Sequence, residues 1–150
     1  MQRVSSANVQ VREKVVGSIS KGLVVFVGVS NDDDELDARY IVNKCLNLRI
    51  FSDCLGKFQF SALDVEAELL VISQFTLYAD TRKGRRPNFT TAASPNEAKS
   101  LFSMVLSEFQ RSSLNVSTGE FGSHMLVSIV NDGPVSIILD SPDKAFDTWL

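Results

Sequence analysis

The sequence predicts an α+β fold, a β-rich sheet or open barrel accompanied by two main helices. Two stretches carry apolar residues at helical spacing, and the remaining apolar residues alternate or form short runs of strand length. The chain has 150 residues, of which 44% are apolar and 22% charged, which is the composition of an ordinary globular chain. We therefore expect a single domain over residues 1–150, with residues 141–150 as a C-terminal tail.

The first third of the chain is expected to hold three strands and a helix. Residues 2–29 contain alternating valines and then the apolar run 22–29, typical of a central strand. The acid-rich residues 31–34 suit a helix start, because acids stabilise the positive end of a helix. Its apolar face is expected to hold Leu36, Tyr40, Ile41, Cys45 and Leu48. A calcium loop is the alternative, but the spaced ligands and turn glycine of an EF-hand are missing.

The rest of the chain is expected to hold short strands, a central strand and a second helix. Short strands are expected at 48–51 and 58–60, and a buried strand at 69–75. The sequence Ser94-Pro95-Asn96-Glu97 is a capping box with proline at the first helical position, and apolar residues follow it at helical spacing. Strands at 125–130 and 135–139 are expected to be joined by a turn at 131–133.

Composition excludes several classes of function. The formal net charge of −3 argues against a protein that coats nucleic acid through bulk electrostatics. One histidine, His124, and two dispersed cysteines make neither a standard zinc site nor a disulfide framework. No apolar run approaches the roughly 20 residues that cross a membrane, and the N-terminus lacks the apolar core of an export signal. We expect a cytoplasmic protein without metal, cofactor, membrane or DNA partner.

Residues 68–87 combine a buried strand with reactive side chains and a basic cluster. The apolar run gives way to Ser73, Gln74, Phe75 and Thr76, and a loop with Arg82, Lys83, Arg85 and Arg86 follows. Hydroxyls and an amide at a strand end, next to an anion-binding loop, suggest a reaction site for a phosphate-bearing substrate. The alternative is that the four cations are simply solvated.

Two kinds of chemistry remain open for this segment. A Ser73 or Thr76 nucleophile needs a base within hydrogen-bonding reach, and nothing in the spacing brings His124 there. No G-x-S-x-G elbow surrounds Ser73. Alternatively, backbone N–H groups at the strand end form an oxyanion hole. A second candidate segment is 131–135, where the ordinary expectation for Gly133-Pro134 is a trans peptide bond in a turn.

Together these segments resemble one family, the D-aminoacyl-tRNA deacylases (formerly D-tyrosyl-tRNA deacylases). The matching pieces occur in family order over residues 2–140; they are Gln2-Arg3-Val4, Gly22-Leu23-Val24, Leu48-Arg49-Ile50-Phe51, Ser73-Gln74-Phe75-Thr76-Leu77, Lys83-Gly84-Arg85-Arg86-Pro87, Thr118-Gly119-Glu120-Phe121-Gly122 and Asn131-Asp132-Gly133-Pro134-Val135. The family's residues before Gln-Arg-Val are shortened here, Ser136 stands where threonine is usual, and residues 142–150 extend beyond the resemblance.

The resemblance implies a homodimeric editing hydrolase that uses no cofactor. It would cleave the ester of D-aminoacyl-tRNA, release free D-amino acid and tRNA, and also deacylate glycyl-tRNA(Ala). Gly133 and Pro134 match a Gly-cis-Pro motif that reaches into the partner's pocket and rejects L-residues, and the resemblance therefore replaces the trans expectation. Arg3 and Asn131 match positions that support this motif.

The remaining roles also follow from the resemblance. Residues 73–76 match the segment that binds the ester and stabilises its oxyanion, while the 2′-OH of the terminal adenosine activates water. Phe121 and Met125 match positions that contact the adenine, and the basic loop is expected to meet the acceptor end. Two rival functions are an esterase with Thr76 as its nucleophile and a non-catalytic protein that binds RNA ends.

Overall fold

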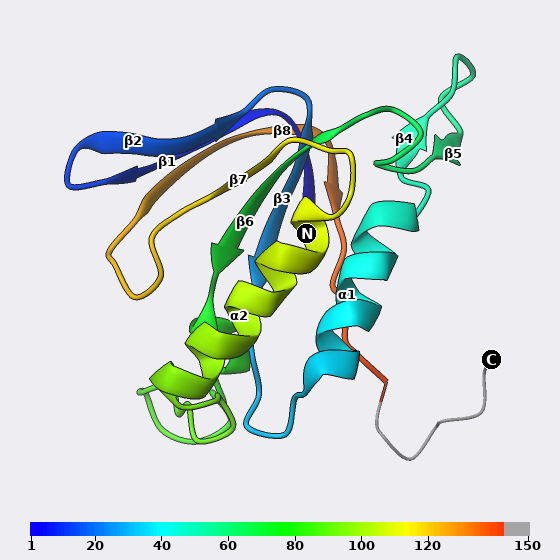
Figure 1. Ribbon diagram of the computed structural model, residues 1–150. Coiled ribbons are helices and arrows are strands. Elements are labelled where there is room, and N and C mark those ends of the chain that lie inside the picture. The colour runs from blue at the N-terminus through cyan, green and yellow to red at the C-terminus, as the bar shows by residue number, and fades with distance from the viewer. Residues whose placement is uncertain (143–150) are drawn as a thin grey trace.

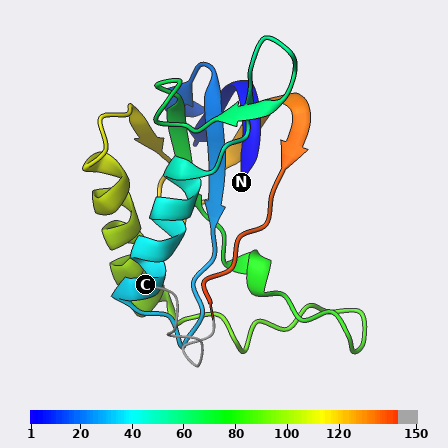
Figure 2. The same cartoon turned by 90° about the vertical axis from the view of Figure 1, so that its right-hand side faces the viewer.

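The computed structural model describes residues 1–142 and has the predicted α+β architecture, with both long helices on one face of a curved sheet (Figures 1 and 2). The helices are α1 (Glu35–Asn47), α2 (Pro95–Gln110) and the short 3-10 helix η1 (Phe75–Tyr78). The strands are β1 (Gln2–Val11), β2 (Lys14–Ile19), β3 (Gly22–Val27), β4 (Phe51–Ser52), β5 (Phe58–Phe60), β6 (Glu68–Ser73), β7 (Val116–Thr118) and β8 (Leu126–Ser136).

The main sheet has the order β2-β1-β3-β6-β7, and β8 also pairs with β1. Residues 2–4 of β1 lie between β3 and β8, whereas residues 7–10 lie between β2 and β8. The two ends of this order also approach each other, because the Ser117 hydroxyl in β7 donates a hydrogen bond of 3.1 Å to the Ser18 carbonyl in β2. The sheet is therefore a nearly closed barrel, as the sequence predicted.

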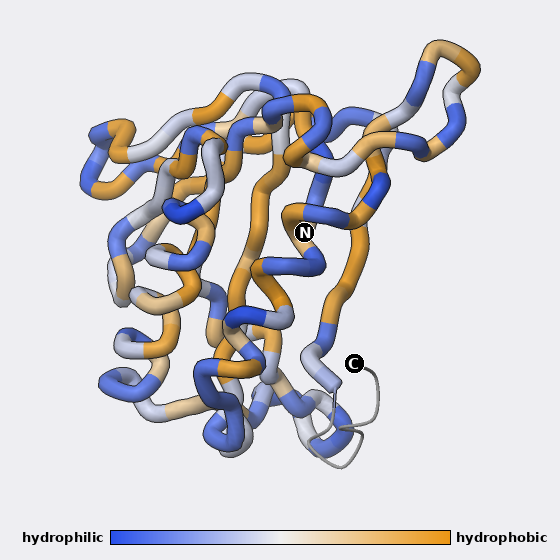
Figure 3. Tube along the Cα trace, turned by 45° about the vertical axis from the view of Figure 1, so that its right-hand side comes forward, coloured by the Kyte–Doolittle hydropathy of each residue, from blue (hydrophilic) through white to orange (hydrophobic). Residues whose placement is uncertain are grey.

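The two faces of β3 and β6 pack into two separate cores. Leu23, Val25 and Leu69 face the helices, together with Phe102 and Phe109 of α2. Alternate residues of the same strands face the inside of the barrel, with Val4 and Val9 of β1. This double burial explains why β3 and β6 are continuous apolar runs, seen as the orange central segments of Figure 3.

The predicted starts of both helices are confirmed. The Asp34 carboxylate accepts a hydrogen bond of 2.8 Å from the Leu36 amide and completes a capping box with Asp37. The Ser94 side chain caps α2 in the same way, together with Glu97. The sequence's expectation of a capping role for this acidic segment is thus confirmed at Asp34, which directly precedes α1.

The predicted buried face of α1 was wrong in part. Leu36 is 69% exposed and Tyr40 36% exposed, while Ala38 and Val42 are buried with Cys45. The buried face is therefore rotated relative to the expected one, and it consists of Ala38, Val42, Cys45 and Leu46. Helical periodicity predicted the helix, but its packing partners determine which of its side chains are buried.

Three strand assignments also need correction. Residues 48–50 are irregular and β4 begins at Phe51. The central strand ends at Ser73, and Phe75 begins η1 instead of continuing the strand. Residues 131–133 are not a hairpin turn, because β8 runs without interruption through 126–136 and both of its halves pair with β1, with shifts in register. From residue 143 on, the expected tail lies outside the described residues.

Candidate active site

The end of β6 and the start of η1 present the first candidate segment. Ser73 pairs with Val27, the last residue of β3, and the Gln74 amide donates a hydrogen bond of 2.7 Å to the Val27 carbonyl. The chain then turns into η1, where Phe75 and Thr76 are exposed. A buried parallel strand thus delivers four polar or aromatic residues to the surface at its carboxyl end.

Side chains within this segment are held by one another and by the loop that follows. The Gln74 side-chain amide donates a hydrogen bond to the Thr76 hydroxyl. The Phe75 ring meets the Phe89 ring edge-on, with centroids 5.1 Å apart and an interplanar angle of 66°. Phe89 had no signal in the sequence that linked it to Phe75, since it lies beyond the basic loop.

Arg3 holds the second candidate segment in place. Its side chain is almost fully buried, and it donates a hydrogen bond of 2.6 Å from Nη1 to the Ile50 carbonyl and one of 3.1 Å from Nε to the Asp132 carbonyl. The Asp132 carboxylate lies 3.4 Å from Nε, and the guanidinium carbon lies 5.6 Å from the centre of the Phe58 ring. Arg3 therefore ties β8 to the segment before β4 and to β5.

Gly133 sits in a tight backbone position beside this arginine. Its φ is +130°, and the peptide bond to Pro134 is cis, as the resemblance implied. A Cβ at Gly133 would lie 2.8 Å from Val135 Cγ2 and 3.2 Å from Arg3 Nη2. Because glycine alone tolerates this combination of φ and space, the segment presents the bare backbone of Gly133 and the ring of Pro134 at the surface.

The four cations of the basic loop differ in their surroundings. All four are exposed, but Arg82 forms two hydrogen bonds with the Asp80 carboxylate, of 2.9 Å from Nε and 2.8 Å from Nη2. This pairing holds the pKa of the Asp80 carboxyl below its ordinary value. Among residues 1–142, Lys83, Arg85 and Arg86 make no such ion pair.

Two further predicted site residues, Phe121 and Met125, lie on the loop between β7 and β8. Phe121 packs against Phe102 of α2, with ring centroids 5.9 Å apart, and Met125 packs against the core inside the barrel. His124 is exposed on the same loop, and no hydrogen bond joins it to Ser73 or Thr76 in the described part of the chain. Asn131 is exposed in β8, and its neighbour Asp132, which the sequence did not single out, is the residue that contacts Arg3.

One chain does not bring the two candidate segments together. Residue Arg3, which pairs with Val135, also pairs with Leu23 near the start of β3. Ser73, in contrast, pairs with Val27 at the end of β3. The four residue steps from Leu23 to Val27 span about 13 Å along the strand. The Gly133-Pro134 segment and the 73–76 segment therefore face opposite ends of the same sheet.

Comparison with known proteins agrees with these features. The sequence profile of the family described as D-Tyr-tRNA(Tyr) deacylase matches residues 1–140. The D-aminoacyl-tRNA deacylase of Thermosipho melanesiensis is 51% identical over 142 residues, covering 94% of this chain and 95% of that protein. The D-aminoacyl-tRNA deacylase of Clostridium botulinum (strain Alaska E43 / Type E3) is 56% identical over 141 residues, with the same coverage.

Solved structures show the same fold. The c-Myc DNA unwinding element binding protein superposes with a TM-score of 0.88 at 38% identity, covering 95% of this chain and 97% of that one. A probable eukaryotic D-amino acid tRNA deacylase superposes with a TM-score of 0.79 at 17% identity, covering 89% and 92%, and this likeness concerns the fold alone.

The fold and the profile define an editing-type hydrolase that acts on an aminoacyl ester of tRNA. The chain belongs to the D-Tyr-tRNA(Tyr) deacylase family, and its activity is D-aminoacyl-tRNA deacylation. Within residues 1–142, neither long helix has the length and apolarity needed to span a membrane.

Proposed function

We propose that this enzyme is a homodimeric, cytoplasmic proofreading hydrolase that cleaves D-aminoacyl-tRNA and glycyl-tRNA(Ala) and rejects L-aminoacyl esters. The observation that carries the proposal is the position of the Gly133-Pro134 segment. Arg3 clamps it, it is exposed, and it faces the end of the sheet opposite to residues 73–76 of its own chain. A second copy is needed to bring the two segments into one pocket.

An exposed apolar face supports a second copy as the partner. Val15, Val16, Leu126 and Val130 are each between 47% and 59% exposed, and they lie on β2 and β8, the two strands that flank β1. On β1, the Oδ1 atom of Asn8 is buried and has no hydrogen-bond partner among the described residues. Large exposed apolar patches of this kind are typical of interfaces between proteins.

The selectivity would come from collision with backbone, not from reading of the side chain. Gly133 and Pro134 would form one wall beside the substrate's α-carbon, so an L side chain meets that wall while a D side chain points out of the pocket. Glycine has no side chain and enters freely. Discrimination by rejecting the wrong partner predicts a broad range of D-residues as substrates.

Residues 73–76 would bind the ester and stabilise its oxyanion through backbone amides. The first-turn amides of a helix have no partner within the helix, so those of Phe75 and Thr76 can donate to a developing negative charge. The Thr76 hydroxyl accepts a hydrogen bond from the Gln74 side chain, and an amide takes up no proton as a general base. This favours water activated by the 2′-OH of the terminal adenosine over a threonine nucleophile.

The tRNA contacts complete the proposal. Phe121 and Met125 would contact the terminal adenine, and Lys83, Arg85 and Arg86 would lie near the acceptor-end phosphates. Asn131, next to the Arg3-bound Asp132, would support the Gly133-Pro134 segment.

The decisive experiment is deacylation of D-Tyr-tRNA, L-Tyr-tRNA and Gly-tRNA(Ala) by the purified protein in the presence of EDTA. Fast release from the D-tyrosyl and glycyl esters, with the L-tyrosyl ester intact, is the expected result. Equal hydrolysis of the D- and L-esters would overturn the proposed selectivity. Thr76→Ala is expected to retain substantial activity, and near-total loss would identify an esterase that uses the threonine as nucleophile. Binding of tRNA without turnover would identify a protein that only binds RNA ends.

A further inference from the structure

Phe89 contacts the proposed catalytic segment from the chain that follows the basic loop. Its ring meets the Phe75 ring edge-on, with centroids 5.1 Å apart. Phe89 itself is half-buried, whereas Phe75 is 58% exposed. Phe89 therefore supplies a ring contact to a residue that otherwise lies largely open to solvent.

The backbone around Phe89 is fixed on both sides. Before it, the Asp80 amide donates a hydrogen bond of 2.7 Å to the Asn88 carbonyl, and the Asn88 amide donates one of 2.9 Å in return, which closes the base of the basic loop. After it, residues 91–93 exchange backbone hydrogen bonds of 2.9 and 3.1 Å with residues 29–31, which follow β3. The Phe89 ring is thus presented to Phe75 by an anchored stretch of chain, next to the loop that projects beyond η1 in Figure 2.

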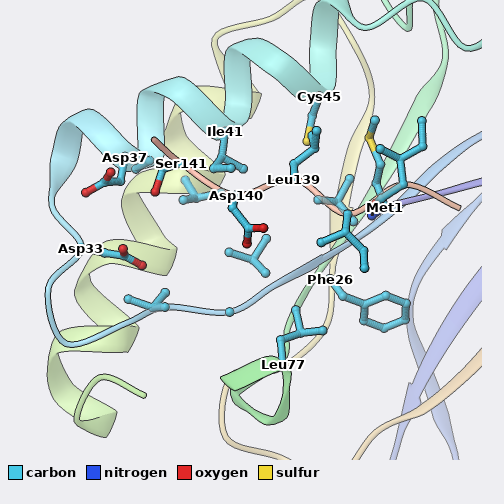
Figure 4. A pocket seen from close by; sticks show the side chains of 18 of the residues that line it. Met1, Phe26, Asp33, Asp37, Ile41, Cys45, Leu77, Leu139, Asp140 and Ser141 are labelled. Atoms are coloured by element: carbon cyan, nitrogen blue, oxygen red, sulfur yellow. Dashed lines mark hydrogen bonds between the residues drawn. The ribbon is translucent and has the colours of Figure 1, made fainter. Parts of the chain in front are cut away.

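The later residues of η1 are placed by a different contact. A Cβ at Gly28 would lie 3.1 Å from the Tyr78 ring and 3.2 Å from Leu77 Cβ, so the missing side chain lets η1 rest on the chain that leaves β3. Figure 4 shows Leu77 pointing from η1 toward this chain. Gly28 therefore positions the end of η1, and Phe89 contacts Phe75 at its start.

The position of Phe75 decides where two backbone amides point. Its Cα lies between its own amide and that of Thr76, the two first-turn donors proposed to stabilise the oxyanion. A ring held by Phe89 restricts the rotation of Phe75, and with it the direction of both N–H groups. Donors of this kind act because they are in place before the charge develops, and a displacement of about 1 Å costs up to about 100-fold in rate.

We propose that Phe89 is a positioning residue for deacylation, which holds Phe75 so that the Phe75 and Thr76 amides stay aimed at the developing oxyanion. This inference rests on the proposed role of residues 73–76. Phe89 acts on the chemical step and not on the affinity for tRNA. The reason is that the backbone of Asp80 and Asn88 closes the base of the basic loop, and it stays closed when the Phe89 ring is removed.

The first test measures kcat for D-Tyr-tRNA deacylation and, separately, the affinity for uncharged tRNA by filter binding. Phe89→Ala is expected to lower kcat about tenfold, the upper end of what an edge-to-face ring pair contributes. The affinity for tRNA should change by less than about twofold. Phe89→Tyr keeps the ring and should retain most of kcat, whereas Phe89→Leu, an apolar side chain of similar size without a ring, should lose as much as Phe89→Ala.

Tyr40→Ala is the matched control for these variants. It removes a ring of α1 that meets the Lys44 ammonium at 5.4 Å, and it should leave both kcat and tRNA affinity unchanged. Circular dichroism checks the folding of each variant, and Phe89→Leu carries the test if Phe89→Ala does not fold. A Phe89→Leu enzyme with the kcat of the parent would overturn the inference, as would an equal loss of kcat and of tRNA affinity.

The second test asks whether Phe89 acts through Phe75. Phe75→Ala is expected to lower kcat, and adding Phe89→Leu to it should lower kcat no further, because two residues that act through one contact are not additive. A further loss of about tenfold in the double variant would show that Phe89 acts elsewhere and would overturn the inference.

A third variant separates failure of this inference from failure of the proposed function. Thr76→Pro deletes one of the two proposed N–H donors and leaves the Phe75–Phe89 pair in place. A folded Thr76→Pro enzyme with the kcat of the parent would refute the oxyanion role of residues 73–76, on which the inference rests. A Thr76→Pro enzyme that loses kcat, together with Phe89 variants that keep it, would refute the positioning role of Phe89 alone.

Discussion

Arg3→Lys is the substitution that tests most directly how the Gly133-Pro134 segment is held. The arginine donates to the carbonyls of Ile50 and Asp132 from two different nitrogens, and lysine carries one compact ammonium group that cannot reach both. The positive charge, and with it the ion pair with the half-exposed Asp132 carboxylate, is retained. The variant therefore loses the pair of hydrogen bonds that the guanidinium donates to two carbonyls, but it keeps the positive charge.

The size of the effect follows from the two hydrogen bonds. A hydrogen bond from a charged donor contributes about 1.5–3 kcal/mol, and loss of one leaves a carbonyl without its partner. The exposed part of the Asp132 ion pair adds little, since pairs in water are worth about 0–1 kcal/mol. Arg3→Lys should thus lower the free energy of unfolding by about 2 kcal/mol, which lowers Tm by about 4–8 °C in a chain of this size.

The assay combines urea unfolding with deacylation of D-Tyr-tRNA and L-Tyr-tRNA. We expect the ratio of the D rate to the L rate to fall by about tenfold, because a loosened Gly133-Pro134 segment moves aside for an L side chain. Arg39→Lys is the matched control, since the Arg39 side chain is 55% exposed and forms only long ion pairs, of 3.9 Å to Glu35 and 3.8 Å to Glu108, among the described residues. An Arg3→Lys enzyme that is as stable and as selective as the parent would refute the proposal that Arg3 holds the Gly133-Pro134 segment in place.

Three further predictions concern single groups. Gly133→Ala places a Cβ 2.8 Å from Val135 Cγ2 at a φ of +130°, so D-Tyr-tRNA deacylation should fall by more than about tenfold while circular dichroism still reports a folded chain. Burial raises the pKa of the Cys45 thiol to about 11, so the native state holds this proton more tightly than the unfolded chain does. The stability that this difference provides is fully present below pH 9 and should be lost as the pH rises toward 11. In urea titrations at several pH values, Cys45→Ala should make this loss smaller. Ser94→Ala should cost about 1 kcal/mol in urea unfolding through loss of the α2 cap, and Ser94→Asp should restore most of it.

Local signals predicted the parts of the fold that depend on neighbours in sequence. The capping residues Asp34 and Ser94 act on amides two or three residues away, so their sequence context is sufficient. The apolar runs of β3 and β6 are buried on both faces, which produces a pattern that needs no knowledge of the partners. These elements were therefore found at nearly their observed bounds.

Long-range pairing decided the parts that the sequence did not predict. Asn131-Asp132-Gly133 has the composition of a turn, yet its backbone continues as β8 because β1 offers partners on both sides of it. Phe75 looks like a strand residue, but β3 ends opposite Ser73 and the chain turns into η1. The roles of Asp132, Phe58 and Phe89 depend on contacts between segments far apart in sequence, for which the sequence held no local signal.

The basic loop offers a prediction that the sequence alone could not make, because the structure separates its four cations. All four side chains are exposed, but Arg82 is paired with Asp80 through two hydrogen bonds, whereas Lys83, Arg85 and Arg86 form no ion pair among residues 1–142. Each phosphate contact that a protein makes contributes about 0.7–0.9 to the slope of log affinity against log salt. The triple variant K83A/R85A/R86A should therefore reduce that slope for tRNA binding by about 2–3, in a filter-binding assay at several salt concentrations.

Arg82→Ala is the matched control for this measurement. The Arg82 charge is already neutralised by Asp80, so Arg82 is not expected to contact a phosphate. Its removal should therefore change the slope by much less than one. Asp80→Asn, which releases the Arg82 guanidinium from its partner, should instead increase the slope. If Arg82→Ala lowers the slope as much as Arg85→Ala does, the ion pair does not persist in the complex and all four cations face the acceptor end alike. If the triple variant leaves the slope unchanged, the loop lies away from the tRNA, and the phosphates are then held by another part of the dimer.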